Sequence, residues 1–495
     1  MSAISKPKKH TSHWFILVLL ALAQFMVVLD ISIVNVALPT IQHAFSLTLS
    51  NLQWIVTAYA LGFGGFLLLG GRNADYFGRR ITFLIGIGIF TLASLGTGLS
   101  QNGTMLIIFR ALQGLAAAYM SPAALSIVLV TYKEGHDRNT ALSVWGAVAA
   151  GGAAIGVLLG GIITQYFSWR WNFFINLPVG IFVIIASLKV LHHHKNEANK
   201  KVSLDLPGAI SVTLGLMALV YSLTEAPTYG WTSARILSIL GFAIAMLIFF
   251  AINESRAKQP LMPLSIFKIR NISGANSLML LMSAGLFSVF FFTTLYLQDI
   301  LHYSKIRTGL DFLVMPVVVA LVATNVPRII KRIGYKPILV VAPLIVSSGL
   351  FWISHIPVAG SFWVNVAPGL TLMGIGMGAL FVSATIAATS GVPHHEAGLA
   401  SGILNTSQQV GGVLGLALLT GVLSSSITSY LNSLHLHGLP TVHQIAVANV
   451  HGFRIGYLIA AGFAFLASIL ATIIIRINKS ESDPSHGEHV VISAA

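Results

Sequence analysis

The sequence predicts an all-α protein that crosses a membrane fourteen times, built as two six-helix halves plus two inserted helices. Composition is the first observation: 55% of the 495 residues are hydrophobic, 8% are charged, and the mean hydropathy is +0.84. These values lie far outside the range of soluble globular proteins. The apolar segments and the positions of the basic residues are the other two observations.

Polar residues, glycine and proline divide the chain into fourteen apolar segments. They fall at residues 14–38, 51–70, 81–99, 104–130, 140–163, 172–190, 204–224, 234–253, 272–298, 309–330, 337–354, 361–388, 398–423 and 453–476. Each has about 18 residues or more, the length that a membrane-spanning helix needs. The first segment is too long for the apolar part of a signal peptide, so we expect it to remain as the first span.

The basic residues are distributed unevenly between the connecting segments. Lys and Arg number 28 against 14 Asp and Glu, which gives a net charge of +14. With the spans above, 22 of the 28 fall in alternate segments that begin with the N-terminus. The positive-inside rule therefore predicts a multi-pass protein of the cell membrane with cytoplasmic N- and C-termini. The basic excess then faces anionic membrane lipid, and we expect no nucleic-acid partner.

Several chemistries are disfavoured by what the chain lacks. There is no cysteine, which excludes disulfides and thiolate metal sites. The sequence contains no phosphate-binding Gly-x-x-x-x-Gly-Lys loop, no His-Glu-x-x-His pair and no polar stretch long enough for a nucleotide-binding domain. We therefore expect neither an enzyme nor an ATP-driven pump, and neither a metal nor another cofactor.

Internal repetition indicates a duplicated six-helix unit. Residues 71–80 align with residues 327–336 at an offset of 256, and an offset of 260 brings Gly114 onto Gly374 and Gly151 onto Gly411. Duplicated halves are common in transporters. The predicted divisions are an N-terminal half at 1–190, a two-helix insertion with its flanking loops at 191–270, a C-terminal half at 271–476 and a cytoplasmic tail at 477–495.

One carboxylate, Asp30, lies deep inside the first apolar segment. An ionised carboxylate at that depth costs roughly 2.5–3.5 kcal/mol on insertion scales. At 100° per residue, Asp30 shares its helical face with Ala23, Val27, Val34 and Ala37, so its own helix does not solvate it. Loss of water favours the neutral form of the acid, which suits Asp30 to carrying a proton.

Arg110, in the fourth segment, is the second charge expected inside the membrane. Counted from the outer ends of their helices, Asp30 is about 12 Å deep and Arg110 about 9 Å, so the two can meet. Small or polar residues that would admit a neighbouring helix share the Arg110 face: Gln113, Gly114, Ala117 and Ser121. A permanent structural ion pair and an exchange of Arg110 for a proton or a cationic substrate both fit this arrangement.

Two further stretches carry candidate residues. The segment at 140–163 is rich in glycine, with Gly152, Gly156 and Gly160 on one helical face and Gly161 beside them. That face predicts close helix packing, which a sliding contact between the halves would also use. The second stretch is a loop with Gly71, Asp75, Gly78, Arg79 and Arg80. There Asp75 can cap the third helix and form a cytoplasmic latch, or the loop is simply a solvated basic loop.

These stretches together resemble the 14-helix drug:proton antiporters of the major facilitator superfamily. The resemblance rests on Asp30–Pro39, the loop Gly71–Arg80, Arg110-Ala-Leu-Gln113-Gly114, the glycine helix ending in Gly160-Gly161, Trp169–Gly180, and Ser401-Gly402 through Gly411-Gly412. It spans nearly the whole chain. Asn73 and Val157 depart from the usual Leu and Pro of that family. The resemblance implies a gating loop at Gly71–Arg80, an antiporter glycine helix, and packing in the second half by Gly402, Asn405, Gly411 and Gly412.

The expected function is therefore secondary active transport, with efflux of amphipathic drugs or toxic organic compounds driven by the proton motive force. A cavity with apolar walls and a single carboxylate favours such small amphipathic molecules over sugars. A proton-coupled importer or facilitator, or a dedicated metabolite exporter of the same fold, is the alternative, because fold does not determine direction. We expect Asp30 and Arg110 to carry the coupling, with protons, the substrate and membrane lipid as partners of a monomer.

Overall fold

The computed structural model describes residues 13–132, 135–191, 205–390, 392, 397–435 and 438–475. Over these residues the chain is helical without strands, and fourteen of its helices are long and apolar enough to cross a membrane. The two termini and the loop that contains Lys195 lie outside the described residues. The sidedness predicted for them remains a prediction.

The spans follow the predicted order, and several are composite. The first half contains α1 (His13–Phe45), α2 (Leu49–Phe77), α3 (Arg79–Gly98), α4 (Gly103–Thr131), α5 (His136–Tyr166), and a span made of α6 (Trp171–Phe174) and α7 (Asn176–Val190). The inserted pair is α8 (Leu206–Tyr229) and α9 (Ala234–Arg256). The rest is η1 (Leu264–Lys268), α10 (Arg270–Leu295), η2 (Tyr296–Ile300), α11 (Lys305–Phe312), α12 (Val314–Ala323), α13 (Val326–Ile333), α14 (Tyr335–Ile353), η3 (Phe362–Val366), α15 (Ala367–Thr389), α16 (Ala397–Ser433) and α17 (Val442–Ile474).

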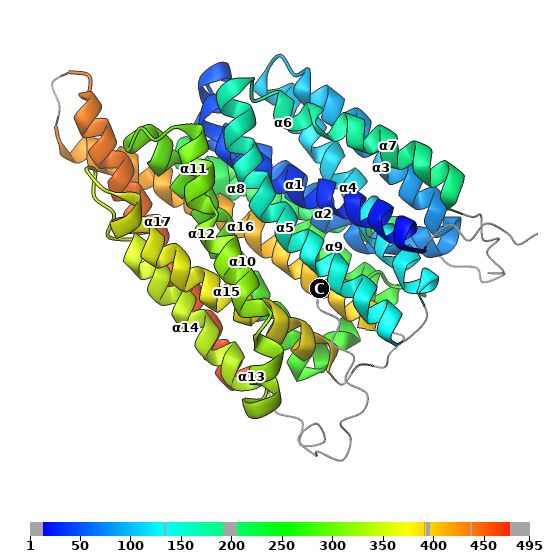
Figure 1. Cartoon of the computed structure of the whole chain (residues 1–495). Coiled ribbons are helices and arrows are strands. Elements are labelled where there is room, and N and C mark those ends of the chain that lie inside the picture. Colours follow the sequence, from blue (N-terminus) through cyan, green and yellow to red (C-terminus); the bar gives the residue numbers. More distant parts are fainter. Residues whose placement is uncertain are drawn as a thin grey trace, which may run out of the picture.

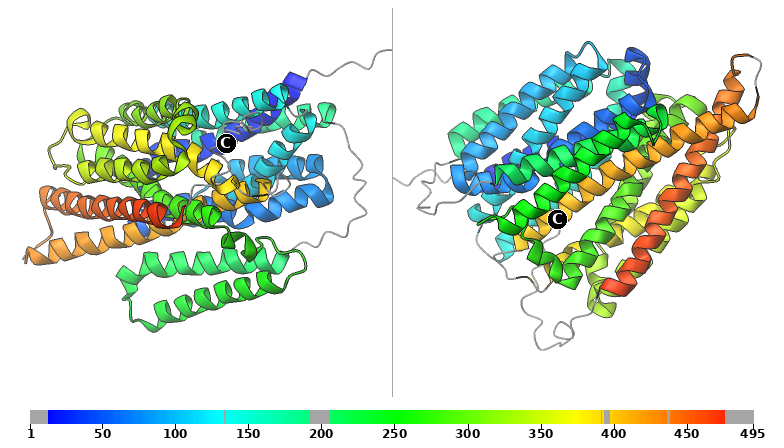
Figure 2. Two further views of the ribbon diagram at one scale, coloured as in Figure 1. Left: turned by 90° about the horizontal axis from the view of Figure 1, so that it is seen from below. Right: turned by 180° about the vertical axis from the view of Figure 1, so that it is seen from behind.

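The helices form two bundles that lie side by side, with the inserted pair beside them (Figures 1 and 2). In the first bundle α2 packs on α4, α1 on α5 and α3 on α4, while in the second α14 packs on α15 and α10 on α16. In the left view of Figure 2, α8 and α9 form a separate hairpin at the bottom, below the two bundles. The hairpin touches both bundles, because α8 contacts α2 of the first and α16 of the second.

Several helix ends differ from the prediction. Helix α8 continues to Tyr229, past the predicted end at 224, and includes Glu225 and Pro227. Helix α12 ends at Ala323, and the basic stretch expected to close that span forms the separate helix α13, with Pro327 in its first turn. Proline suits a first turn and cannot continue a helix, which explains the break. Helix α16 runs on to Ser433 and α17 begins at Val442, so this hairpin is longer than its apolar segments.

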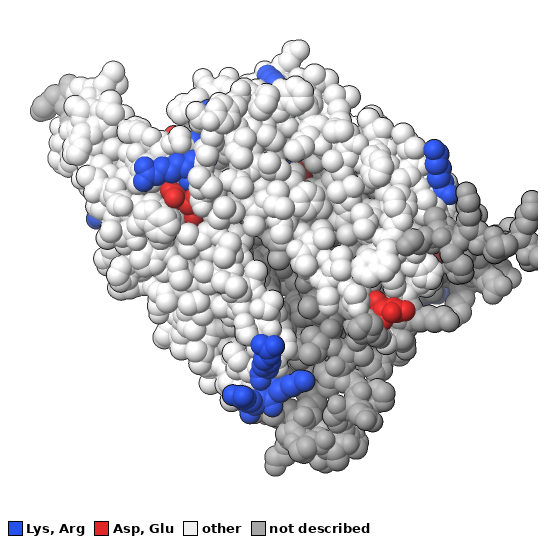
Figure 3. Space-filling model, in the orientation of Figure 1, with Lys and Arg blue, Asp and Glu red and all other residues white. Residues whose placement is uncertain are grey.

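The surface supports membrane insertion of the bundle. On the face shown in Figure 3 most side chains are uncharged, and the charged groups gather towards the ends of the helices. One basic group lies at the end that carries α13, whose last turn contains Lys331 and Arg332. Helix α9 presents large apolar side chains outward, including Leu237, Phe242 and Ile248. An exposed face of this kind is suited to lipid and not to water.

Candidate functional site

Asp30 and Arg110 meet in the interior of the first bundle. Arg110 Nη1 donates to Asp30 Oδ2, and the two residues are 1% and 0% exposed respectively. The depth counted along α1 and α4 thus placed the two charges at the same level. In this conformation water has no access to the ion pair, so protein groups must supply the hydrogen bonds that water would otherwise make.

Two neutral amides complete the environment of the carboxylate. Asp30 Oδ1 accepts from Gln113 Nε2 at 3.0 Å and from Asn176 Nδ2 at 2.9 Å. The Ser94 hydroxyl of α3 lies between the amides, accepting from Gln113 Nε2 at 2.8 Å and from Asn176 Nδ2 at 3.4 Å. The carboxylate therefore has one charged donor and two neutral ones. The two neutral donors hold Asp30 independently of its contact with Arg110.

Arg110 is itself held by α2. Its Nε donates to the Ile55 carbonyl oxygen at 3.0 Å, and its Cζ lies 4.4 Å from the centre of the Tyr59 ring. Gly114 makes this approach possible, because a Cβ at that position would overlap the Tyr59 carbonyl. The guanidinium thus connects α1, α2 and α4 at one level, and its contact with the aromatic face adds a favourable cation–π interaction.

The sequence indicated part of this site. Asp30, Arg110 and the position of Gln113 on the Arg110 face followed from spacing. Asn176 lies within the motif Trp169–Gly180, which does not assign it a contact, and Ser94 belongs to no motif. Both are buried polar residues in otherwise apolar helices. A polar side chain inside an apolar segment is the signal that would have found them, since such a residue needs a partner within the bundle.

The glycine helix α5 packs closely on α1, the helix that carries Asp30. A Cβ at Gly156 would lie 2.7 Å from Ser32 Cβ, and one at Gly160 would lie 2.5 Å from the Ile33 carbonyl oxygen. Gly152 faces Val28 less closely but still tightly, because its Cβ would lie 3.2 Å from Val28 Cβ. Gly161 faces the opposite bundle instead, because its Cβ would lie 2.5 Å from the Lys305 carbonyl oxygen of α11. Helix α5 therefore touches both α1 and the second half.

Hydrogen bonds connect the two halves near the C-terminal ends of α1 and α5. Gln298 Nε2 donates to the Val36 carbonyl at 2.9 Å, and the Lys305 backbone N–H donates to Gln165 Oε1 at 3.3 Å. His43 Nε2 lies 3.7 Å from Asp299 Oδ1 and forms an ion pair when protonated. These contacts join the halves at the ends of α1 and α5 that the charge pattern assigns to the outer side.

At the opposite end, the loop residues are arranged differently from the expectation for Asp75. Asp75 lies in the last turn of α2, 3.9 Å from Arg79, and it does not cap α3. The residue before α3 is Gly78, whose φ of 98° favours glycine, and glycine has no side chain that could cap the helix. Arg80 Nη2, in the first turn of α3, donates to the Leu188 carbonyl of α7 at 3.0 Å. Gly71 faces Pro122 of α4, because a Cβ at Gly71 would lie 3.9 Å from Pro122 Cβ.

The four residues assigned to second-half packing take different positions. A Cβ at Gly411 or Gly412 would strike the Leu280 backbone or the Phe287 ring of α10. Gly402 faces Leu68 of α2, across the two halves. Asn405 is exposed, contrary to the expectation that it packs.

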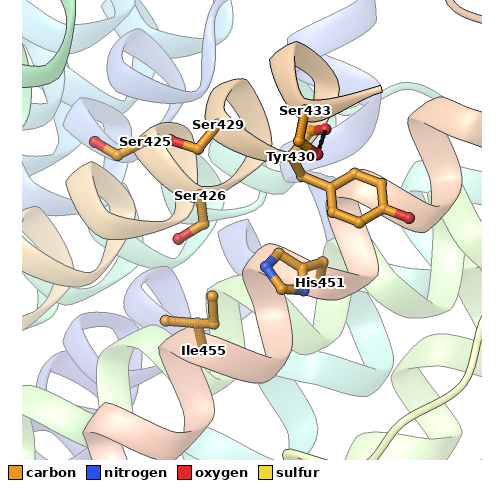
Figure 4. Close-up of a pocket in the computed structure, with 7 residues that line it drawn as sticks. All are labelled: Ser425, Ser426, Ser429, Tyr430, Ser433, His451 and Ile455. Atoms are coloured by element: carbon orange, nitrogen blue, oxygen red, sulfur yellow. Dashed lines mark hydrogen bonds between the residues drawn. The ribbon is translucent and has the colours of Figure 1, made fainter. Parts of the chain in front are cut away.

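A hollow with polar side chains in its walls lies on α16 and α17, outside the helices that surround the ion pair. Its walls carry the side chains of Ser425, Ser426, Ser429, Tyr430 and His451 (Figure 4). None of these residues comes from the helices around Asp30. The hollow is shallow and open, and we assign no function to it.

Two bundles of membrane-spanning helices, with a buried ion pair in one and contacts between them at one end, form the architecture of a secondary transporter. The profile of the Major Facilitator Superfamily matches residues 20–416, which is most of the chain. The chain belongs to this superfamily.

Similar proteins extend over nearly the same length. The puromycin resistance protein pur8 of Streptomyces alboniger is 37% identical over 473 residues, which cover 95% of this chain and 93% of that protein. The cephamycin export protein CmcT of Amycolatopsis lactamdurans is 36% identical over 411 residues, covering 83% and 85%. The multidrug resistance protein Stp of Mycobacterium tuberculosis is 32% identical over 415 residues, covering 84% and 76%.

Solved structures share the fold. The POT family transporter PepTSo superimposes with a TM-score of 0.69 at 14% identity, over 93% of this chain and 97% of that chain. A bacterial homologue of the human lysosomal transporter Spinster, in an inward-facing form, gives 0.64 at 16% identity, over 95% and 100%. At such identities the likeness concerns the fold alone.

Proposed function

We propose that this protein exports small amphipathic organic compounds across the cell membrane in exchange for protons. The relatives named for puromycin resistance, cephamycin export and multidrug resistance support the export of such compounds. The proposed coupling to protons rests on the fully buried Asp30–Arg110 pair, in which two neutral amides also bind the carboxylate. The proton motive force is the energy source in this proposal, and no cofactor is required.

Protonation is the step that changes the pair. A proton on Asp30 removes its charge, so the attraction to Arg110 weakens, while Gln113 and Asn176 keep the neutral acid in place. Arg110 then remains against the Tyr59 ring and the Ile55 carbonyl as an unpaired cation. A charge left alone in a low-dielectric interior is costly, and this cost favours a conformation that hydrates it.

The link to the other half runs through α1 and α5. Gly156 packs beside Leu29, the residue before Asp30, and Gly161 on the same helix packs on α11 of the second half. A shift of α1 on protonation therefore displaces α5, and α5 contacts the second half directly through α11. We propose that α5 slides against α1 and α11 during transport. The glycines that allow close packing would then also form the sliding surface.

Transport in everted membrane vesicles tests the direction and the coupling together. Vesicles that contain the protein should accumulate a fluorescent lipophilic cation when their lumen is acidic, and an uncoupler should release it. A matched set of right-side-out vesicles should show no uptake driven by an inward proton gradient. Uptake in the right-side-out set would support an importer, and accumulation insensitive to the uncoupler would exclude proton coupling.

A further inference from the structure

A second pair of buried acids lies at one end of the inserted hairpin, apart from Asp30. Asp205 precedes α8 and is 6% exposed, and Glu254 is in the last turn of α9 and is 3% exposed. Asp205 Oδ1 accepts from the Gly208 N–H at 2.9 Å and from Asn253 Nδ2 at 2.8 Å. Glu254 Oε2 accepts from the Met262 N–H at 2.9 Å. The two acids therefore hold together both helix ends and the segment that follows α9.

The other two oxygens of these acids, Asp205 Oδ2 and Glu254 Oε1, lie beside each other next to Gly208, and Asp205 Oδ2 also accepts from Asn253 Nδ2 at 2.9 Å. A Cβ at Gly208 would lie 2.6 Å from Asp205 Oδ2 and 2.8 Å from Glu254 Oε1, so both oxygens are next to the same point. Glu254 Oε1 is buried and receives no hydrogen bond from any donor. An oxygen in this position repels its neighbour if both acids are ionised. A single proton held between them satisfies both, as in other carboxyl pairs that share one proton.

Arg72 is the cation near this pair, and within the described part of the chain its hydrogen bonds go to backbone carbonyls and not to the two acids. Arg72, in the last turns of α2, is the basic residue that acts on both acids, and Asp75 is its other acidic neighbour. The Arg72 guanidinium donates to the carbonyls of Gln259 and Pro260. These belong to the segment between α9 and η1, which leads into the second half. Arg72 thus connects the first bundle to the segment between α9 and η1. The hydrogen bond from Met262 to Glu254 connects the same segment to α9.

We propose that Asp205 and Glu254 bind one proton between them, and that this proton fastens the inserted hairpin to the segment leading into the second half. With the proton bound, the acids hold both ends of the hairpin and the segment stays on Arg72. Loss of the proton leaves two ionised acids facing each other, which loosens the Glu254–Met262 contact. The joint is therefore closed at lower pH and opens as the pH rises. It is separate from coupling through Asp30.

Thermal unfolding of the purified protein in detergent tests the proton. The wild-type Tm should fall by about 2–4 °C as the pH is raised from mildly acid to mildly alkaline values. In Glu254→Gln the amide donates to Asp205 at every pH, so this fall should be absent while the Tm at low pH is kept. Glu225→Gln, at the other end of α8, is the matched control and should follow the wild type. An equal fall in Glu254→Gln would overturn the proposal.

A distance measurement tests the joint itself. Phe77 at the end of α2 and Lys258 after α9 are both exposed, and the chain has no cysteine. Spin labels on Phe77→Cys and Lys258→Cys should give a narrow distance distribution at low pH that broadens as the pH rises. Adding Glu254→Gln should keep it narrow throughout. A distribution that ignores pH, or that narrows with added sodium or calcium at high pH, would show that no proton closes the joint.

Discussion

Asp30 can be ionised in the membrane interior because other helices supply what its own helix lacks. Its oxygens accept from Arg110 of α4, Gln113 of the same helix and Asn176 of α7. The depth of each charge along its helix was enough to predict that Asp30 and Arg110 meet. The two amide contacts were not predictable in this way, since they depend on the rotation of α4 and α7 about their axes. Because Gln113 and Asn176 also donate to the carboxylate, Asp30 keeps hydrogen-bond partners when its protonation changes.

Removing Arg110 should separate the coupling role of the pair from a structural one. Arg110→Ala leaves the carboxylate without its cation, which costs about 3–5 kcal/mol and favours the protonated acid. Proton release should then fail, so coupled transport is lost at neutral pH and returns in part as the external pH is raised. Arg110→Lys, a point charge in place of a planar fork, should retain partial activity. Drug transport measured across pH, beside the yield of solubilised protein, checks this.

A purely structural pair predicts a different pattern. Both Asp30→Asn and Arg110→Ala would then misfold, and the double variant would regain yield. Transport by Arg110→Ala at the wild-type rate and neutral pH would contradict both interpretations.

The helices were predictable in number and order, while their ends were less so. Hydropathy identifies the length of chain that lies in lipid, but a helix can continue into water, as α16 and α17 do. The chain breaks between α12 and α13 because Pro327 starts a new helix there. Hydropathy, which averages over a whole segment, does not show the effect of one proline. The glycine spacing of α5 predicted close packing. It could not identify the partners, which are α1 for Gly156 and Gly160 and α11 for Gly161.

The contact between Gly161 and α11 can be tested by adding one methyl group. A Cβ at Gly161 would lie 2.5 Å from the Lys305 carbonyl oxygen, whereas Gly151 on the same helix has nothing within 4 Å. Gly161→Ala should therefore destabilise the contact between the halves by about 1–3 kcal/mol and slow transport several-fold. Gly151→Ala should transport like the wild type. Equal rates for the two variants, at equal expression, would show that α5 does not bear on α11 during transport.

At the scale of the whole molecule, the charge distribution predicts which end faces the cytoplasm. Phe77 ends α2, next to Arg79 at the start of α3, and Tyr166 ends α5, the helix that packs on α11, at the opposite end of the bundle. Both side chains are exposed. In the cysteine-free chain, Tyr166→Cys should react with an impermeant maleimide added to intact cells, and Phe77→Cys should react only after permeabilisation. The reverse pattern would invert the topology.

Accumulation and exchange in proteoliposomes test the central proposal, that Asp30 carries the coupled proton. Asp30→Asn keeps the shape of the side chain but cannot titrate. The variant should lose all accumulation of drug driven by a pH gradient, yet still exchange labelled for unlabelled drug when no gradient is present. Exchange without accumulation would place the proton on Asp30, whereas accumulation at the wild-type level would exclude Asp30 as its carrier.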